Sequence, residues 1–492
     1  MKFKPEFKEA VKYASEYKML PVMAEIFSDI KTPVSVLKVL KELGHHCFLL
    51  ESAEKSQKWG RYSFIGFNPS VEISCTNEVL TIVEENEEEK IYKTTNPETY
   101  IKEILEENKA PNFDWLPTFA GGLVGYFSYD FIKYMEPNLK LDAKDEEKFK
   151  DFDLMLFDKV IAFDNVRQKM MIIVNIKTDT IEENYENAIL TISEIANLIK
   201  TKNPDLNEKG KLKSEFKPLF TKEEFCSMVN KAKNYIKEGD IFQVVLSNRL
   251  EAKYEGSLLN TYRYLRTTNP SPYMFYFSSD DIEIAGASPE TLVKLNGDEL
   301  STFPLAGTRP RGKTEKEDME LEIELIQDKK ELAEHNMLVD LGRNDLGKIS
   351  KFGTVEVEKY MSVEKFSHVM HIGSTVKGII QDDKTALDAI YAVLPAGTLS
   401  GAPKIRAMEI INELENNKRG IYGGAIGYID LRGNLDTAIA IRIAFKKNNK
   451  VFVRSGAGIV FDSDPEKEYI ETINKAKAVI NAIQNSEEEL WF

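Results

Sequence analysis

The sequence contains little cysteine and little histidine. Its 492 residues include three cysteines, Cys47, Cys75 and Cys226, and five histidines. The cysteines lie far apart and are odd in number, so they indicate neither a disulfide framework nor a cysteine-based zinc site. Scattered cysteines of this kind fit a reducing compartment, and we expect a cytoplasmic location.

The sequence also lacks long apolar runs and an excess of positive charge. No stretch reaches the roughly 18 consecutive apolar residues that cross a bilayer, and the N-terminal MKFKPEFKEAVKYASEY has no apolar signal segment. The net charge of -15 argues against nucleic acid or an anionic membrane as a partner. A small anionic substrate is not excluded, because a metal ion or an arginine can override the overall charge locally.

What is present is the composition of a large globular protein, with 42% hydrophobic and 29% charged residues. Residues 201–218 (TKNPDLNEKGKLKSEFKP) are polar, contain proline and glycine, and have almost no apolar residues. Such a composition is typical of a connection between domains. We therefore predict an N-terminal part, residues 1–200, a linker, residues 201–218, and a C-terminal part, residues 219–492.

The order of the expected elements favours an α+β fold. Residues 221–240 begin with the capping box Thr221 and Glu224 and end at Gly239, which predicts a helix. Residues 154–176 alternate as a β-hairpin does, around Asp164. Many strands follow one another without an intervening helix, so antiparallel or mixed sheets with flanking helices are expected rather than a doubly wound parallel sheet.

Two segments, 328–345 and 462–476, each carry glutamates three residues apart, on one face of a predicted helix. The pairs are Glu331 with Glu334, and Glu468 with Glu471. Such pairs are common on solvated helices, and that interpretation stays open for each pair alone. Two helices that each offer such a pair could also meet around one hard cation, and oxygen ligands without cysteine or clustered histidine favour Mg²⁺.

Several glycine-rich, charge-poor strands are expected between the two pairs. They are residues 368–373, 395–404, 421–430, 439–445 and 454–464. The GAGIV sequence at 456–460 lacks the continuation of a dinucleotide-binding motif. Arg442 lies in the apolar segment IAIRIAF and needs an anion, which is either a core carboxylate or a substrate carboxylate. His371 is either a core histidine or a catalytic one.

Longer motifs occur in a fixed order along nearly the whole chain. They are LLES (49–52), WGRYSFIG (59–66), NPSPYMFY (269–276), GASPETLV (286–293), PLAGTRPRG (304–312), ELAEHNMLVDLGRNDLG (331–347), AGTLSGAPK (396–404), IYGGAIGY (421–428) and GAGIVFDSDPEKEYIETINKA (456–476). The set resembles the chorismate-utilising enzymes, most closely the component I family of anthranilate synthases. The resemblance implies mixed sheets packed as a sandwich with helices outside.

The resemblance also implies roles for single residues. Glu334 and Glu471 would bind Mg²⁺, with Glu331 and Glu468 completing the acidic cage through water. The substrate contacts would come from Tyr422, Arg442, the Gly456-Ala457-Gly458 segment, Lys475 and Thr398, with His371 as acid or base facing the C4 hydroxyl of chorismate. The implied reaction adds ammonia to chorismate and releases anthranilate and pyruvate, the first committed step of tryptophan biosynthesis.

Two positions separate this reaction from those of related enzymes. The resemblance implies that relatives that add water have a lysine at the position of Gln243, and that relatives that add ammonia at C4 have a lysine at the position of Ala306. Because this chain lacks both lysines, addition of ammonia at C2 is favoured. Aminodeoxychorismate synthase is the alternative enzyme. A tryptophan-sensing protein without catalysis is a third candidate, which the full set of acidic, histidine and arginine residues disfavours.

Ammonia must come from elsewhere, because no cysteine lies in a sequence that looks like an amidotransferase nucleophile turn. A separate glutamine amidotransferase subunit is implied, in a heterotetramer. The resemblance also implies a feedback site for L-tryptophan. Its residues would be Glu51, Ser52, Pro272, Tyr273, Met274, Ile426 and Tyr428. The alternative is that LLES is only the end of a strand and that PYMFY is only a strand of the core.

Overall fold

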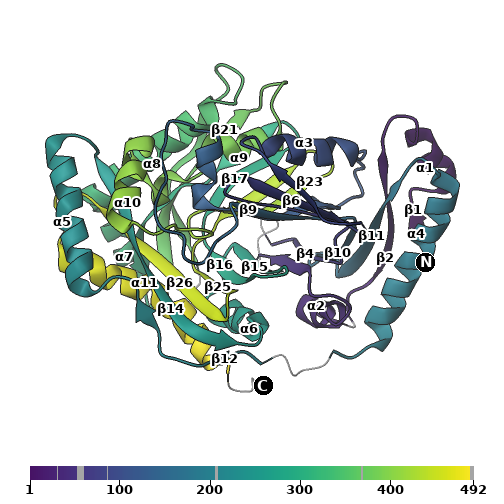
Figure 1. The fold of residues 1–492 in the computed structure, drawn as a ribbon, viewed down its shortest axis with the longest axis horizontal. Coiled ribbons are helices and arrows are strands. Elements are labelled where there is room, and N and C mark those ends of the chain that lie inside the picture. Colours follow the sequence, from purple (N-terminus) through teal and green to yellow (C-terminus); the bar gives the residue numbers. More distant parts are fainter. Residues whose placement is uncertain (30, 53–59, 86, 205–208, 367–368, 488–492) are drawn as a thin grey trace.

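The fold was analysed in a computed structural model, which describes residues 1–29, 31–52, 60–85, 87–204, 209–366 and 369–487. Trp59, linker residues 205–208 and His368, which the sequence motifs include, lie outside these ranges. Two large sheets form the centre of the molecule, and helices lie around them (Figure 1). All pairings between the described strands are antiparallel, apart from one isolated parallel bridge between Lys144 and Asn417.

The first sheet has 14 described strands. Their spatial order is β1 (Phe3–Lys4), β2 (Met19–Phe27), β11 (Lys169–Lys177), β10 (Lys159–Asp164), β4 (Tyr62–Phe67), β3 (Cys47–Glu51), β15 (Tyr273–Ser278), β16 (Glu283–Ser288), β25 (Ile443–Lys447), β26 (Lys450–Ile459), β14 (Gln243–Glu255) and β12 (Lys211–Leu212), with β13 (Lys217–Pro218) and β22 (Gly401–Ala402) also on β14. The hairpin expected at Asp164 is formed by β10 and β11.

The second sheet has 12 described strands. Their order is β19 (Leu305–Pro310), β21 (Val369–Ile379), β18 (Glu299–Thr302), β17 (Thr291–Asn296), β24 (Leu435–Ile439), β23 (Ala425–Asp430), β8 (Gly122–Phe127), β9 (Phe152–Phe157), β5 (Val71–Thr76), β6 (Val79–Glu84) and β7 (Lys90–Lys93), with β20 (Glu356–Lys365) on β21. Each sheet therefore combines strands from both halves of the chain. The division at 201–218 remains a prediction.

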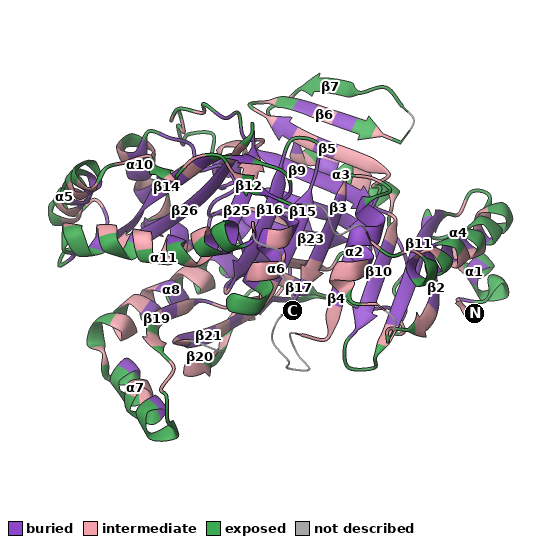
Figure 2. Ribbon diagram, turned by 90° about the horizontal axis from the view of Figure 1, so that it is seen from below, coloured by how far each residue is buried: buried purple, intermediate pink, exposed green. Residues whose placement is uncertain are grey.

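Helices lie outside the sheets, and exposed residues are concentrated on them, whereas most strands are buried (Figure 2). They are α1 (Phe7–Tyr13), α2 (Pro33–Lys41), α3 (Glu98–Glu107), α4 (Ile181–Thr201), α5 (Lys222–Glu238), α6 (Leu259–Thr268), α7 (Glu315–Gln327), α8 (Lys329–Gly347), α9 (Ala386–Val393), α10 (Lys404–Glu415) and α11 (Pro465–Asn485), with 3₁₀ turns η1 (Tyr129–Tyr134) and η2 (Gly397–Leu399). The capping box of α5 and its left-handed glycine end, Gly239, are as expected. None of the described helices is long and apolar enough to cross a membrane.

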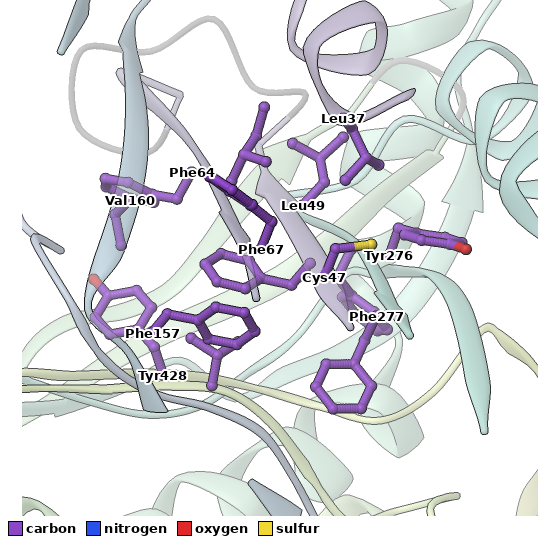
Figure 3. Close-up of a cluster of buried hydrophobic side chains, with 14 of the residues drawn as sticks. Leu37, Cys47, Leu49, Phe64, Phe67, Phe157, Val160, Tyr276, Phe277 and Tyr428 are labelled. Carbon is purple, nitrogen blue, oxygen red and sulfur yellow. The ribbon is translucent and has the colours of Figure 1, made fainter. Parts of the chain in front are cut away.

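The faces of the two sheets pack against each other in a continuous apolar core. In this core Phe48 of β3 packs against Phe157 of β9, and Phe64 of β4 packs against Tyr428 of β23, so strands of the first sheet contact strands of the second. Figure 3 shows part of it, and there Cys47 and Leu49, on the other face of β3, lie beside Leu37 of α2. The expected α+β fold, with antiparallel sheets packed as a sandwich and helices outside, is therefore confirmed.

Two of the expected strands are wrong. Residues 395–404 form η2, the two-residue β22 and the start of α10 instead. Pro395 and Pro403 lack the N–H groups that a central strand needs. Residues 439–445 are broken at Arg442, which has a left-handed φ of 54°, and the chain there passes from β24 in the second sheet to β25 in the first. An apolar run shows that both sides are buried, but it does not show that the two ends join different sheets.

Candidate active site

Helix α8 carries the first acidic pair. Asp328 is its N-cap, and its side chain accepts hydrogen bonds from the N–H groups of Lys330 and Glu331 at 3.0 and 3.3 Å. Arg309 of β19 also pairs with Asp328, at 3.0 Å. Asp328 thus serves the helix end, and Glu331 and Glu334 form the acidic pair of the next turn, where Glu331 lies 3.8 Å from the same Arg309.

The second acidic pair lies on α11, where Glu468 is buried and Glu471 is partly exposed. Burial and the neighbouring Glu471 raise the pKa of Glu468, and Lys330 of α8 is near enough to oppose that shift. Burial and Glu334 similarly raise the pKa of Glu331. Each pair therefore carries mutual repulsion that a cation would relieve.

The two pairs do not bring the oxygen atoms of three of their glutamates within 4.8 Å of one another. In the described part of the chain, three possible ligand atoms come within 4.8 Å of one another at His46, Glu72 and Asp280, and at no other group. There each ring nitrogen of His46 faces a different carboxylate, and these contacts raise the pKa of His46 to about 9. That arrangement is a doubly paired imidazolium that joins β5 to the β15–β16 turn, so we assign no metal to it.

Gln243 begins β14 beside the first acidic pair. Its amide Nε2 donates to Oε1 of Glu334 at 3.1 Å. Gly458 on the neighbouring strand β26 leaves room for this contact, since a Cβ there would lie 2.6 Å from the same Nε2. In the sequence Gln243 indicates only that a lysine is absent at this position, whereas in the structure it holds a predicted metal ligand.

Arg442, Lys475 and Gly456 meet around one backbone segment. Lys475 of α11 pairs with Glu471 at 2.6 Å and donates to the carbonyl of Gly456 at 3.1 Å. Arg442 donates to the carbonyl of Lys475 over a long 3.4 Å, and no carboxylate of the described chain forms an ion pair with it. Burial lowers the pKa of Arg442. A half-buried guanidinium without a carboxylate partner in the described chain favours the interpretation that its anion is a ligand.

Tyr422 completes this cluster. Its hydroxyl lies next to Gly456, where a Cβ would approach within 3.0 Å, and burial raises its pKa to about 12. Tyr422 therefore stays a neutral hydrogen-bond donor. The ring of Tyr422 lies 5.9 Å from the guanidinium of Arg419.

A buried ion network lies beneath these residues. Glu415 pairs with Arg419 and with Arg454, each at 2.6 Å, and all three side chains are almost completely buried. Arg419 also donates to the carbonyls of Leu399 and Val245. The network thereby ties β14 and β26 to the η2 turn that presents Thr398, which fixes the strands that carry the predicted substrate contacts.

His371 lies in β21, half-buried, with its Nδ1 2.8 Å from the carbonyl oxygen of Gly307. A carbonyl oxygen only accepts, so Nδ1 carries the proton and Nε2 has a free lone pair. Burial lowers the pKa of His371, and the nearby charge of Arg442 contributes to the lowering. His371 is consequently a neutral imidazole that can accept a proton at neutral pH.

Glu290 lies at the turn between β16 and β17 and is buried. Burial raises its pKa to about 8, and Thr398 donates to its Oε1 at 3.1 Å. This carboxyl group is therefore mostly protonated at pH 7. Glu290 belongs to the GASPETLV motif, but no role for it follows from the sequence, where its only signal is that it is a lone carboxylate between apolar residues.

The predicted tryptophan residues converge between the two sheets. Met274 of β15 pairs with Glu51 of β3, and Met274, Ile426 and Tyr428 belong to one buried core. Tyr273 packs against that core and bonds to Asp436 and to Thr291, the residue after Glu290. Pro272 and Ser52 adjoin these strands.

Glu51 already has partners. It accepts from Tyr262 at 2.5 Å and pairs with Arg266 at 2.9 Å. Its carboxylate is thus fixed at the end of β3. Whether this region binds tryptophan stays a prediction, as do the assigned roles at the acidic pairs and around Arg442.

Comparisons with known proteins agree on one family. The profile of the family described as chorismate binding enzyme matches residues 45–481. The chain is 47% identical to anthranilate synthase component 1 of Acetivibrio thermocellus, over 99% of both chains. It is 46% identical to the protein of the same name from Aquifex aeolicus, over 98% of both.

Solved structures with the same architecture include anthranilate synthase component I from Streptococcus pneumoniae TIGR4. The TM-score is 0.77 with 37% identity, over 92% of this chain and 98% of that one. The isochorismate synthase MenF from Escherichia coli gives a TM-score of 0.69 at 19% identity, over 97% of this chain and 99% of that one, a likeness of fold alone.

Proposed function

Since the chain belongs to the family of chorismate binding enzymes, we propose that it is the aminase component of an anthranilate synthase. It would convert chorismate and ammonia into anthranilate, pyruvate and water, the step that commits chorismate to tryptophan. The observation that carries this proposal is the half-buried Arg442, without a carboxylate partner in the described chain, beside Lys475 and the glycine strand β26. A dianionic substrate supplies the anions that this cluster needs.

The residues present fit a magnesium ion. Glu331, Glu334, Glu468 and Glu471 offer oxygen atoms only, in two mutually repelling pairs on facing helices. Bound there, Mg²⁺ would polarise the ring carboxylate of chorismate. Glu334 and Glu471 are proposed as direct ligands and Glu331 and Glu468 as supports through water.

The other contacts orient the substrate. Arg442 and the hydroxyl of Tyr422 would hold the carboxylate of the enolpyruvyl arm, and the N–H groups of Gly456 and Gly458 would donate to the ring carboxylate. The lack of side chains on these glycines lets the ring approach the strand closely. The network of Glu415, Arg419 and Arg454 below keeps these groups in place.

We assign the proton donor to Glu290 and the base to His371. Glu290 keeps its proton up to about pH 8, whereas the free Nε2 of His371 accepts one. Two titratable groups with pKa values shifted in opposite directions are a usual sign of an acid and base pair. The resemblance places His371 at the C4 hydroxyl, but a neutral imidazole of lowered pKa is a poor donor to a leaving group.

The reaction then balances in two steps. Glu290 protonates the C4 hydroxyl, which leaves as water while the nitrogen of ammonia forms a bond to C2 and the ring double bonds shift. After loss of the extra ammonium proton, His371 removes the ring proton at C2, the C3–O bond breaks, and the enolpyruvyl arm leaves as the enolate of pyruvate. A proton from the imidazolium or from solvent then adds to its methylene carbon and gives pyruvate. The ring becomes aromatic, which drives the second step.

The positions around the ring favour ammonia at C2. Gln243 holds Glu334 through an amide, which cannot act as the base that would activate water. Ala306 of β19 lies opposite Ile372, next to His371, and offers no amine for attack at C4. We therefore place the chain with the anthranilate synthases rather than with the aminodeoxychorismate enzymes.

A partner and an inhibitor follow from the same proposal. The relatives are called component 1, which implies a second component. We infer that this is a glutamine amidotransferase that supplies ammonia, in a heterotetramer. L-tryptophan would bind between β3, β15 and β23 and inhibit the enzyme.

One assay tests the proposed activity. The purified chain is incubated with chorismate, ammonium chloride and MgCl₂ at mildly alkaline pH, and anthranilate fluorescence is followed. Glu334→Gln and Glu471→Gln should abolish product, while Glu466→Gln on the exposed side of α11 should not. Absence of product with the wild-type chain, or equal product after chelation of Mg²⁺, would refute the proposal.

A further inference from the structure

One face of α8 connects the acidic pair to the opposite end of the helix. Glu334, Leu338, Leu341 and Asp345 follow one another at intervals of four, three and four residues, so they lie along the same side. From Glu334 to Asp345 this side extends about 16 Å at the usual helical rise.

Two cavities lie along this face. The outer cavity has a volume of about 390 Å³ and is bounded by η1, the last turns of α8 and α9, and the start of α10. The inner cavity has a volume of about 40 Å³, and both Thr398 and Glu290 line it. Leu341 and Asp345 line both cavities, so they form the boundary between them.

The size of the inner cavity selects its occupant. A volume of 40 Å³ accommodates a molecule close to the size of water, about 30 Å³ in the liquid, but not a ten-carbon acid such as chorismate. Its lining includes Leu338, Leu341, Val393 and Ala396. An apolar wall of this kind favours neutral ammonia over the ammonium ion.

The outer cavity is lined by hydrogen-bonding groups and by two lysines, Lys348 and Lys404. Both lysines pair with the carboxylate of Asp345, at 3.4 and 2.7 Å, and Lys404 also donates to the carbonyl of Val393 at 3.1 Å, so the cavity carries little net charge that would hold an ammonium ion. The buried hydroxyl of Tyr391 has no hydrogen-bond partner among the described residues. Ile405, about a third exposed, lies at the rim.

We propose that this face of α8 is the entry route for ammonia, that it opens between η1 and α10, and that Leu341 controls passage to the substrate. The inference rests on the proposed function and deepens it, since chorismate would enter separately, on the side of Arg442 and α11. Leu341 is half-buried and contacts Gly397, whose Cβ would lie 2.6 Å from its Cδ1. The absence of a side chain at Gly397 thus leaves space beside Thr398.

Leu341→Trp tests the route in the full chain, with ammonium chloride as the probe. A larger side chain at the boundary should raise the KM for ammonium by about tenfold or more, with the KM for chorismate within about twofold of wild type. Leu341→Phe should give an intermediate increase. Leu341→Met, which conserves volume, and Ile323→Trp, on the exposed side of α7, are the controls and should leave both constants unchanged.

Circular dichroism and thermal melting establish whether each variant folds. If Leu341→Trp does not fold, Leu341→Phe takes its place in the test. An unchanged KM for ammonium in folded Leu341→Trp or Leu341→Phe, or equal increases in both KM values, would overturn the route while leaving the function intact. A wild-type chain without ammonium-dependent anthranilate formation would refute the proposed function and the route with it.

Discussion

At the scale of single residues, the buried carboxyl group of Glu290 is the most informative. Its pKa of about 8 makes it a proton donor at neutral pH, and a donor is active only while protonated. Turnover by the wild type should therefore fall as pH rises through about 8. Glu290→Gln should lower kcat by about 10²- to 10³-fold and remove this alkaline limb. The measurement is the pH profile of anthranilate formation from ammonia, corrected for the fraction of free base.

A substitution at Thr398 tests the role of Glu290 as proton donor a second time, because it should shift the alkaline limb in a known direction. Its hydrogen bond stabilises the ionised form of Glu290 and so opposes the effect of burial on the pKa. Thr398→Val removes the bond and should raise the pKa of Glu290 further, which moves the alkaline limb to higher pH. A limb that moves to lower pH, or stays in place, would show that another group titrates there.

Arg442 is the residue on which substrate affinity should depend. Loss of a charge-assisted hydrogen bond costs about 1.5–3 kcal/mol, so Arg442→Gln should raise the KM for chorismate by about tenfold to a hundredfold. Arg343→Gln is the matched control, because Arg343 is exposed and pairs only with Asp340 in the same helix. Steady-state kinetics at saturating ammonium decide the outcome, and equal KM values in the two variants would contradict the role of Arg442.

At the scale of elements, substitution of a glycine in β26 should change metal binding without changing the stability of the fold. A Cβ at Gly458 would meet the flexible amide of Gln243, so Gly458→Ala should fold but displace Gln243 from Glu334. We expect a weaker apparent affinity for Mg²⁺ with little change in Tm. The control is Gly347→Ala at the end of α8, where the added Cβ would have no atom within 4 Å. This substitution should raise the free energy of unfolding by up to about 1 kcal/mol. A normal Mg²⁺ dependence in Gly458→Ala would contradict the role given to Gln243.

How far the elements could be predicted from sequence depends on whether the signal is local. The capping box of Thr221 and Glu224 fixed the start of α5, and Gly239 fixed its end, because both act within one helical turn. The same local logic placed Glu331 and Glu334 on one face of a helix. Sheet membership is not local: nothing in IAIRIAF indicates that β24 and β25 join different sheets.

The residues of the site also differ in whether their role can be predicted from local sequence. Arg442 stood out because a charge in an apolar run is anomalous wherever the run goes. Glu290 was overlooked because its pKa depends on burial by segments far away in the chain, among them the Thr398 turn. The separation of the two acidic pairs could not be derived either, since it depends on how α8 and α11 are held by different sheets and helices.

At the scale of the whole molecule, the two predicted sites are joined by a short path. The hydroxyl of Tyr273, in the predicted tryptophan region, lies 2.9 Å from that of Thr291, and Thr291 follows Glu290 in the chain. Tryptophan that shifts β15 would thereby shift the proton donor. Ser52→Arg should abolish inhibition by tryptophan, and Tyr273→Phe should weaken inhibition more than it weakens tryptophan binding.

Isothermal titration with tryptophan and inhibition assays on the same preparations separate binding from coupling. Val166→Arg, on the exposed turn between β10 and β11, serves as a control and should retain full inhibition. Tyr273→Phe with unchanged inhibition would exclude this path, and Ser52→Arg with unchanged tryptophan binding would exclude the proposed site.

The pairing of β3 with β15 has a consequence for how the chain is made. One edge of β3 pairs with the nearby β4, but residues 47–51 find the partner of their other edge only at residues 274–278. Strand β26, which completes the glycine strand of the site, ends at residue 459. During synthesis the N-terminal strands therefore wait with an unpaired edge until more than half of the protein has been translated. Contacts so distant in sequence also slow the search for the folded state. The cell must protect that edge from pairing with another nascent chain, which makes the speed of translation and the availability of chaperones part of how much active protein it obtains.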